Sequence, residues 1–439
     1  MDRISHILSS LVNNETVSSG RYSGYDLSAI NELLALSGSP HLEGKFVHIA
    51  GTNGKGSVAW MLAVILQETG LRTGLYTSPH LLTINERIRV DMLPIGDEAL
   101  ERYVRTLEKH LESMHASPTW FDAVTWAAFC HFADSKVDIA IMETGLGGRL
   151  DSTNVIKPEV SIITEIAMDH AALLGKSLKK IAYEKAGIIK QGVPVIAAAG
   201  PGSSLRVIRE RAQTERSPLL AEGDDFETSS IHAADGGGTL FNFSCNSTLT
   251  GFMDIKDIFI SSDCTIQARN AGMAVTAAAM LADRQPAELE QQVRNALGSL
   301  SIPGRCEKLF DIPIVYFDPA HNPAALQTIL ESIRHRFPHH ELTIVASFMK
   351  DKDHEEMLSI LCSHGVQHLV YHVLEDPRCF VPDSHSLNAF GDARVTHSKK
   401  DLFQLLEQQG RTAGIILFTG SFRLYQAASE FITYLESVK

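Results

Sequence analysis

The sequence predicts an α/β fold in two domains, and three observations lead to this prediction. Strand-like and helix-like stretches alternate through most of the chain, which is typical of a mostly parallel sheet covered by helices. The alternation restarts after the segment 301–305, where proline and glycine mark a boundary. A chain of 439 residues is long enough for two or three separate cores. We therefore place a larger domain at 1–300 and a smaller α/β domain at 301–439.

The expected strands of the larger domain are short apolar runs separated by stretches of helical length. The first of them, 46–50, is apolar at nearly every position, as a strand buried on both faces of a parallel sheet should be. Further apolar runs of similar length follow along the chain. We expect strands at 46–50, 72–77, 137–143, 160–166 and 194–197, and helices at 57–69, 121–135 and 179–185.

The pattern changes between 226 and 260. The run Gly236-Gly-Gly238 is a turn signal, and residues 239–244 alternate at period two, which indicates a small antiparallel insertion. Two helices are expected after it, at 267–282 and 288–297. In the smaller domain the candidate strands are 312–317, 342–347, 368–373 and 414–418.

Composition excludes several classes of protein. The chain is 44% hydrophobic and 21% charged, as soluble globular proteins are, and no apolar run approaches the roughly 20 residues that span a bilayer. The net charge of −13 argues against nucleic acid as the main partner. No secretory signal is expected, and none of the six cysteines forms a C-x-x-C pair. We expect a cytoplasmic protein with free, mostly buried thiols and no membrane partner.

The most informative segment follows the first strand and predicts a phosphate-binding loop. Gly51, Gly54 and Gly56 allow the backbone to turn sharply and to bring its N–H groups against an anion. The helix after them would direct its positive end to a phosphate. Lys55 adds a mobile charge, and the Ser57 hydroxyl suits a hydrated magnesium ion. Gly56 separates the lysine from the hydroxyl, which departs from the usual G-x-x-x-x-G-K-[ST] spacing.

Three later strand ends carry candidate metal ligands. Ser78 follows the second strand, Glu143 ends the third, and His170 follows the fourth. The carboxyl ends of parallel strands open onto a common crevice, so these side chains are expected to converge beside the phosphate loop. Magnesium takes few protein ligands and fills its other positions with water and phosphate oxygens.

Further candidates stand elsewhere in the chain. Lys185, on a largely apolar helix end, is by itself most simply a surface lysine whose stem covers apolar neighbours. Arg305 suits a phosphate clamp, and Asp318 suits ribose hydroxyls or, alternatively, a simple turn and helix cap. If Arg305 and Asp318 face the larger domain, a nucleotide would bind between the domains, and closure could exclude water.

Together the segments resemble the folylpolyglutamate synthase and dihydrofolate synthase family of the Mur ligase superfamily, which forms amides at the expense of ATP. They occur in the family's order between residues 46 and 353. The matching segments are 51–57, 77–81, 86–88, 143–151, 153–154, 169–170, 184–188, 267–270, 303–305, 318–323 and 350–353. The resemblance implies a P-loop domain like the central domain of the Mur ligases and a Rossmann-like glutamate ligase domain.

The resemblance also implies roles for individual residues. The nucleotide would be bound by the loop residues Gly51, Thr52, Asn53, Gly54, Lys55, Gly56 and Ser57, of which Gly54 to Ser57 would hold the ATP phosphates. Magnesium would be served by Ser57, Ser78, Glu143 and His170. Lys185 looks like the family's carboxylated lysine, which replaces the first interpretation of this residue. The nucleotide would also contact Asn270, Arg305 and Asp318. The catalytic candidates would be Lys55, Lys185 and His321, the last of which lies near the nucleotide contacts. The pterin region would include Thr119, Phe121 and Asp151.

Three positions depart from the family pattern. Ile266 stands where the family usually has histidine, Pro319 replaces a glycine, and 346–349 reads Ala-Ser-Phe-Met. These departures affect expected adenine contacts and details of the smaller domain. They leave the phosphate and metal positions unchanged.

The expected reaction converts a substrate carboxylate to an acyl phosphate with ATP, after which the amine of L-glutamate attacks and phosphate leaves. The acceptor would be dihydropteroate, a reduced folate or both, and a bifunctional monomer is favoured. One alternative is a Mur-type ligase that acts on a non-folate carboxylate, which the three departures permit. Another is a nucleotide-binding regulator without catalysis, against which Lys55, Glu143, His170 and Lys185 argue.

Overall fold

The chain folds into two compact units. The first comprises Met1–Ile231, Leu240–Ile260 and Gln267–Leu300, and the second comprises His232–Thr239, Ser261–Ile266 and Ser301–Lys439. The structure is a computed structural model that describes residues 2–13, 26–198, 202–366, 368–387, 390, 392–410 and 414–437.

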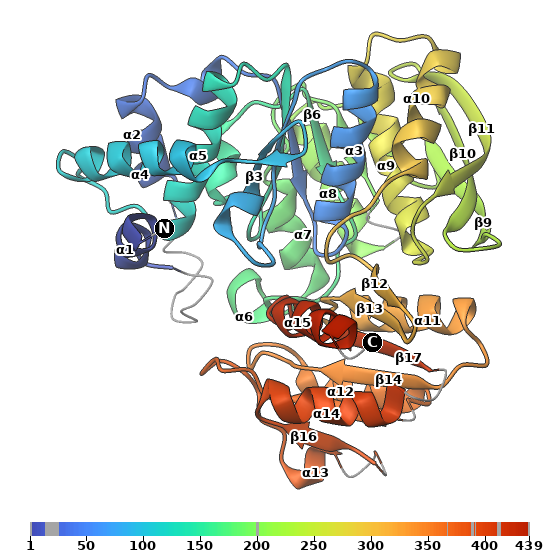
Figure 1. Cartoon of the computed structure of the whole chain (residues 1–439). Helices are drawn as coiled ribbons and strands as arrows, with labels where there is room; N and C mark the ends of the chain where they lie inside the picture. Colours follow the sequence, from blue (N-terminus) through green and yellow to red (C-terminus); the bar gives the residue numbers. More distant parts are fainter. Residues whose placement is uncertain are drawn as a thin grey trace. The chain divides into compact units, whose positions relative to one another are not determined.

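An eight-stranded sheet forms the centre of the first unit (Figure 1), in the order β4-β3-β2-β5-β1-β6-β7-β8. The strands from β2 to β8 in this order pair in parallel, whereas β3 and β4 extend one edge antiparallel. The sheet is therefore mostly parallel, as the sequence predicts. The bounds are β1 Phe46–Ala50, β2 Thr73–Tyr76, β3 Ile88–Val90, β4 Leu93–Pro94, β5 Ile139–Glu143, β6 Val160–Ile163, β7 Val195–Ala197 and β8 Leu219–Ala221.

Helices cover this sheet and bury its apolar side chains. Every residue of β1, β5 and β6 is buried, which explains why these strands are mostly apolar and show no period-two alternation. One core joins α2, α4 and α5 to the sheet, and another joins α7 and α8 to β6 and β7. The helices are α1 Asp2–Ser10, α2 Ser28–Leu36, α3 Lys55–Glu68, α4 Asp97–Leu111, α5 Trp120–Asp134, α6 Ala171–Leu174, α7 Leu178–Ala186, α8 Ser203–Thr214, α9 Ile266–Leu281 and α10 Pro286–Gly298.

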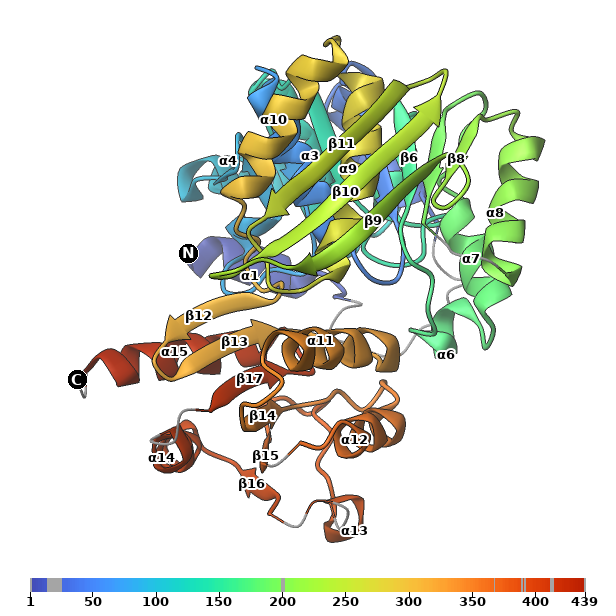
Figure 2. The same cartoon turned by 90° about the vertical axis from the view of Figure 1, so that its right-hand side faces the viewer.

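A separate three-stranded sheet has the order β11-β10-β9, and Figure 2 shows its strands together beside α9 and α10. The strands are β9 Phe226–Ala233, β10 Thr239–Ser247 and β11 Gly251–Ile260. Their connections are too short for a parallel crossover, so the strands are antiparallel hairpins. Buried and more exposed residues alternate along β10, as the period-two pattern predicts.

The second unit contains a six-stranded sheet in the order β12-β13-β17-β14-β15-β16. Only the pair formed by β12 and β13 is antiparallel among the described strands of this sheet. The strands are β12 Glu307–Asp311, β13 Ile314–Asp318, β14 Leu342–Ala346, β15 His368–His372, β16 Arg394–Thr396 and β17 Ile415–Thr419. The helices are α11 Pro323–Arg336, α12 His354–Ser363, α13 Ser384–Leu387, α14 Lys399–Gly410 and α15 Leu424–Ser437.

Several elements differ from the sequence predictions. Helix α3 begins at Lys55, two residues before the expected start, because Gly54 turns the chain with a positive φ of 86°. The elements without a counterpart among the sequence predictions include helices α1, α2 and α4 and strands β8, β12 and β16. The three strands have only three to five residues each, and edge strands carry little apolar signal.

The six cysteines are free, four of them buried, Cys130 half-buried and Cys362 exposed. The prediction of free, mostly buried thiols is therefore confirmed. Over the described residues, no helix combines the length and the apolar character that a membrane span requires.

Candidate active site

The loop after β1 can be built only with glycine at two positions. A Cβ on Gly51 would lie 1.7 Å from Thr164 Oγ1, and one on Gly54 would lie 2.5 Å from Asn270 Oδ1. Gly54 is the N-cap residue of α3 and supplies no side-chain cap, so the first N–H groups of this helix have no hydroxyl or carboxylate from the cap position. An open helix N-terminus of this kind favours an anion.

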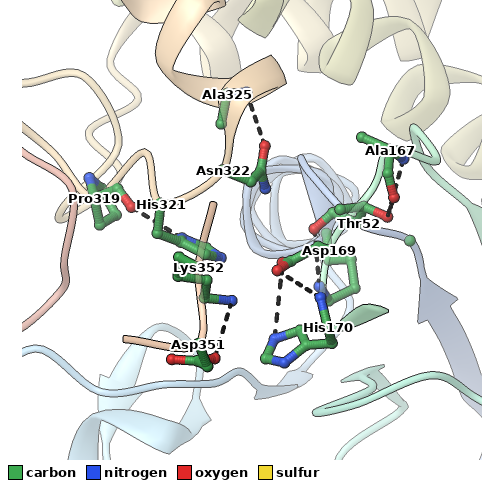
Figure 3. A network of polar contacts seen from close by, with 12 residues as sticks. Thr52, Ala167, Asp169, His170, Pro319, His321, Asn322, Ala325, Asp351 and Lys352 are labelled. Carbon is green, nitrogen blue, oxygen red and sulfur yellow. Dashed lines mark hydrogen bonds and ion pairs between the residues drawn. The ribbon is translucent and has the colours of Figure 1, made fainter. Parts of the chain in front are cut away.

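Hydrogen bonds hold this loop against the end of β6. The Thr52 hydroxyl donates to Ala167 O and accepts from Ala167 N, each at 3.1 Å (Figure 3). Thr52 N donates to Glu165 O at 2.7 Å, and Asn53 Nδ2 donates to Glu165 Oε2 at 3.1 Å. The loop is therefore held in this conformation by its own hydrogen bonds.

Lys55, Gly56 and Ser57 occupy the first turn of α3. Lys55 Nζ donates to Thr52 O at 3.2 Å, and Ser57 is buried. The turn thus combines an ammonium, a hydroxyl and the positive end of a helix, which is the donor set that a phosphate chain requires.

Candidate metal ligands lie at the same edge of the sheet. In the parallel register Glu143 pairs with Ile49 of β1, so its carboxylate ends the strand beside the one that leads to the phosphate loop. Glu143 is buried, and its Oε2 accepts from Ser78 N at 3.0 Å. The structure thus brings Ser78 and Glu143 together.

His170 is the N-cap residue of α6 and lies in the left-handed region, with φ of 46°. Its backbone N donates to Asp169 Oδ1 at 2.8 Å, and its ring Nε2 lies 3.7 Å from Asp169 Oδ2 (Figure 3). Within the described residues, no three His, Cys, Asp or Glu side chains gather into a ready metal site. A serine, a buried carboxylate and a histidine still fit magnesium, because this ion keeps most of its ligands as water and phosphate oxygens.

Lys185 is buried at the end of α7, so its first interpretation as a surface lysine is wrong. Its Nζ donates to Gly51 O at 2.5 Å, directly under the phosphate loop. Burial, with the nearby Lys55 charge, lowers the pKa of Lys185 to about 7, although Asp169 and Asp151 oppose this shift. The amine is therefore partly neutral near physiological pH.

The three residues predicted for the pterin region have different surroundings. Thr119 forms a capping box with Asp122 at the start of α5, with Thr119 Oγ1 2.7 Å from Asp122 Oδ2. Phe121 packs on Gly145 so closely that a Cβ there would lie 2.6 Å from its ring. Asp151 is buried, and its carboxylate accepts from Leu146 N and Thr153 N. Burial raises the pKa of Asp151, and these hydrogen bonds oppose the rise.

Asn270 belongs to the first unit, where it lies on α9 beside Gly54 and donates to Gln267 Oε1 at 2.9 Å. The second unit brings Arg305 and His321 to one ring: Arg305 Cζ lies 4.8 Å from the Phe422 centroid, and the His321 and Phe422 ring centroids are 5.8 Å apart. Sequence reasoning missed Phe422, which lies beyond the last of the matching segments, 350–353.

Asp318 ends β13 and accepts from Cys306 N at 2.9 Å and Ala320 N at 3.0 Å. Burial raises the pKa of Asp318, and the charge of Arg305 opposes the rise. His321 Nδ1 donates to Pro319 O at 2.9 Å, as Figure 3 also shows. These hydrogen bonds agree with the alternative interpretation of this segment as a simple turn. One His321 ring nitrogen is used in a hydrogen bond to a backbone carbonyl.

A buried polar network was also missed. His48 Nε2 lies 2.8 Å from Thr153 Oγ1, which donates to Asp151 Oδ1 at 2.6 Å, and Ser152 Oγ donates to Asp122 Oδ1 at 2.6 Å. The sequence feature that could have indicated this network is a histidine between Val47 and Ile49 in an otherwise apolar strand.

Comparison with known proteins gives consistent matches over most of the chain. Residues 49–256 match the Mur ligase middle domain, and residues 304–422 match the Mur ligase glutamate ligase domain. The chain is 34% identical over 403 residues to a dihydrofolate synthase/folylpolyglutamate synthase of Bacillus subtilis, covering 90% of this chain and 92% of that protein. It is 35% identical over 340 residues to a folylpolyglutamate synthase of Lacticaseibacillus casei, with 76% and 77% covered.

Solved structures agree with these sequence matches. A Mycobacterium tuberculosis folylpolyglutamate synthase complexed with ADP superposes with a TM-score of 0.85 at 28% identity, covering 98% of this chain and 97% of that one. An FPGS-AMPPCP-folate complex superposes with a TM-score of 0.82 at 30% identity over 99% of both chains.

Proposed function

This chain belongs to the folylpolyglutamate synthase and dihydrofolate synthase family, and on that premise we propose that it joins L-glutamate to dihydropteroate, to reduced folates or to both. The reaction is an ATP-dependent amide ligation. The observation that carries the proposal is the open N-terminus of α3, with Lys55 and Ser57 in its first turn and buried Glu143 at the neighbouring strand end.

The chemical difficulty lies in the substrate carboxylate, which is a poor electrophile. Transfer of the terminal phosphoryl group of ATP to this carboxylate gives an acyl phosphate and ADP. The glutamate amine then attacks the acyl carbon, and phosphate leaves. The α3 N–H groups and Lys55 would stabilise the charge that develops during phosphoryl transfer.

Magnesium would be held by Ser57, Ser78, Glu143 and His170 together with phosphate oxygens. When bound, the ion supplies charge neutralisation at the transferring phosphoryl group. Glu143 suits this role because its carboxylate is buried at a strand end and is held by Ser78 N at 3.0 Å.

Lys185 is proposed to react with carbon dioxide and to act as a carbamate, as the family resemblance implies. Its burial under the loop supports this role, since a carbamate forms only from the neutral amine and burial disfavours the charged form. The neutral amine would form an N–C bond to carbon dioxide and release one proton, which leaves an anion beside Lys55.

The remaining assignments rest on the same resemblance. Asn270, Arg305 and Asp318 are proposed nucleotide contacts, His321 is a proposed catalytic residue, and the acceptor region is proposed to include Thr119, Phe121 and Asp151. Division of the chain near residue 300, a cytoplasmic location and a monomeric state are parts of the proposal as well.

The test is the dependence of ADP formation on all three substrates. Purified protein should form ADP only when ATP, a pteroate or reduced folate, and L-glutamate are present together. Labelled oxygen placed in the acceptor carboxylate should appear in phosphate. ATP turnover that ignores both co-substrates would contradict the proposal, and a comparison of dihydropteroate with tetrahydrofolate shows which synthase activities are present.

A further inference from the structure

A buried relay connects the strand that leads to the phosphate loop with the loop after β5. His48 stands in the middle of β1 and is fully buried, and its Nε2 lies 2.8 Å from Thr153 Oγ1. The Thr153 hydroxyl lies 2.6 Å from Asp151 Oδ1. Three side chains from β1 and from the loop after β5 therefore form one chain of hydrogen bonds.

The direction of these hydrogen bonds follows from the proton count. A carboxylate can only accept, so the single hydroxyl proton of Thr153 is donated to Asp151. The same hydroxyl must then accept from His48, which fixes the histidine as the tautomer with its proton on Nε2. His48 Nδ1 is left without a hydrogen-bond partner. Burial, together with the charge of Lys190, lowers the pKa of His48 to about 3, which agrees with a neutral ring.

A buried ring nitrogen without a partner is a cost to the fold. An aliphatic side chain in the centre of β1 would avoid this cost, since every other side chain of the strand is apolar. A histidine at this position can donate a hydrogen bond to Thr153, whereas an aliphatic residue cannot.

The relay acts on the loop 144–151, which is tightly packed on two sides. On one side Phe121 covers Gly145, and on the other Gly148 lies against α7, where an added Cβ would lie 3.0 Å from Lys185 O. Asp151 closes this loop, because its Oδ2 accepts from Leu146 N at 2.8 Å while its Oδ1 accepts from Thr153. A rotation of the Asp151 carboxylate would therefore disturb the loop between Phe121 and Lys185.

We propose that His48 is a positioning residue, which acts through Thr153 to hold the Asp151 carboxylate and with it the acceptor side of the loop 144–151. The inference rests on the proposed function, because the Phe121 side of this loop is assigned there to acceptor binding. His48 touches no substrate in this scheme. Its effect is on the affinity for the pteroate or folate acceptor and not on ATP.

The variants separate the donated hydrogen bond from simple packing. His48→Leu removes the donor and keeps an apolar volume, whereas His48→Gln returns an amide N–H near the position of Nε2. Ser161→Ala is the matched control, because Ser161 is the β6 partner of His48 in the sheet, is fully buried and donates to Ile188 O at 3.2 Å. It loses one buried hydrogen bond that does not lead to Asp151.

Steady-state kinetics give the first measurement. His48→Leu should raise KM for the acceptor by about tenfold or more, because a network that ends on a carboxylate is lost. The KM for ATP should stay within about twofold, His48→Gln should recover most of the loss, and Ser161→Ala should match the wild-type acceptor KM. In an Asp151→Ala background, His48→Leu should cause no further change.

Hydrogen exchange gives a second measurement that does not depend on turnover. Amides of 145–153 should exchange faster in His48→Leu than in the wild type, and at the wild-type rate in His48→Gln and Ser161→Ala. Unchanged exchange in His48→Leu would overturn the proposal, as would an acceptor KM that rises equally in Ser161→Ala. The hydrogen-exchange rates could follow the prediction while the protein forms no ADP in response to folate. That result would support the relay and contradict the proposed function.

Discussion

The two units use the same strand–turn–helix connection and finish it in opposite ways. In the first unit β1 leads through Gly54 into α3, whose cap position has no side chain to offer. In the second unit β13 leads into α11, where Asn322 Oδ1 accepts from Ala325 N at 2.9 Å, as Figure 3 shows, and Pro323 removes one further N–H. The first helix end is left open for a ligand, whereas the second is closed by its own residues.

The difference shows how a few residues leave the same fold element open to a ligand or close it. Glycine at the cap exposes N–H donors, and asparagine followed by proline uses them or removes them. The open end also has Lys55 in its first turn and buried Lys185 below the loop. Three substitutions test this comparison.

Lys55→Gln should have the largest effect, because it removes the mobile charge from the open helix end and keeps a similar length. We expect kcat for ADP formation to fall by about 10²- to 10³-fold, as for the loss of one transition-state donor. The matched control is Lys256→Gln, which removes an exposed lysine paired with Asp254. Equal rates in the two variants would contradict the assignment of α3 as the phosphate site.

Lys185→Met should change how stability depends on pH. The folded-state pKa of Lys185 is lowered to about 7 by burial, from an ordinary value near 10.5. Between these two pKa values the unfolded chain binds more protons at Lys185 than the folded chain does, so the free energy of unfolding rises as pH rises. The destabilisation caused by burying the charged lysine is fully present below pH 7. From pH 7 to pH 9 this contribution should amount to about 2–3 kcal/mol.

Denaturant unfolding of the wild type and of Lys185→Met in buffer free of carbon dioxide measures this difference. The variant should lose this part of the pH dependence. Parallel profiles for the two proteins would show that the lysine is not desolvated in solution.

Asn322→Ala should have the smallest effect and a purely structural one on α11. The loss of the side-chain cap should lower the free energy of unfolding by about 1 kcal/mol, and Asn322→Asp, which retains a capping oxygen, should restore most of it. Chemical denaturation followed by circular dichroism measures both. A destabilisation by Asn322→Asp as large as that by Asn322→Ala would mean that the cap is not what holds this helix end.

Local patterns in the sequence were sufficient for the elements that frame the site. The apolar run 46–50 and the later apolar runs predicted the central strands of the eight-stranded and six-stranded sheets, because burial on both faces leaves a signal within a few residues. The start of α3 was placed two residues late, since the backbone conformation of Gly54 cannot be read from its neighbours. The resemblance to a known family supplied predicted roles that spacing could not, namely those of Lys185, Asn270, Thr119, Phe121 and Asp151.

Other features depend on contacts between distant segments. The local sequence around Lys185 predicts a surface lysine. Its burial follows only from the packing of α7 under the loop that contains Gly51. The pairing of His48 with Thr153 joins residues 105 positions apart in the sequence. Phe422 was missed because its contacts with Arg305 and His321 lie across more than a hundred residues of chain.

The sequence by itself determined the α/β class, the restart of strand–helix alternation after 301–305, and the glycine-rich turn between β1 and α3, because glycine conformations and apolar runs are short-range properties. Only the tertiary structure decided which polar groups are buried, which of them share hydrogen bonds, and which helix end stays open. Those outcomes depend on desolvation and on partners from remote segments, and neither quantity exists until the chain has folded.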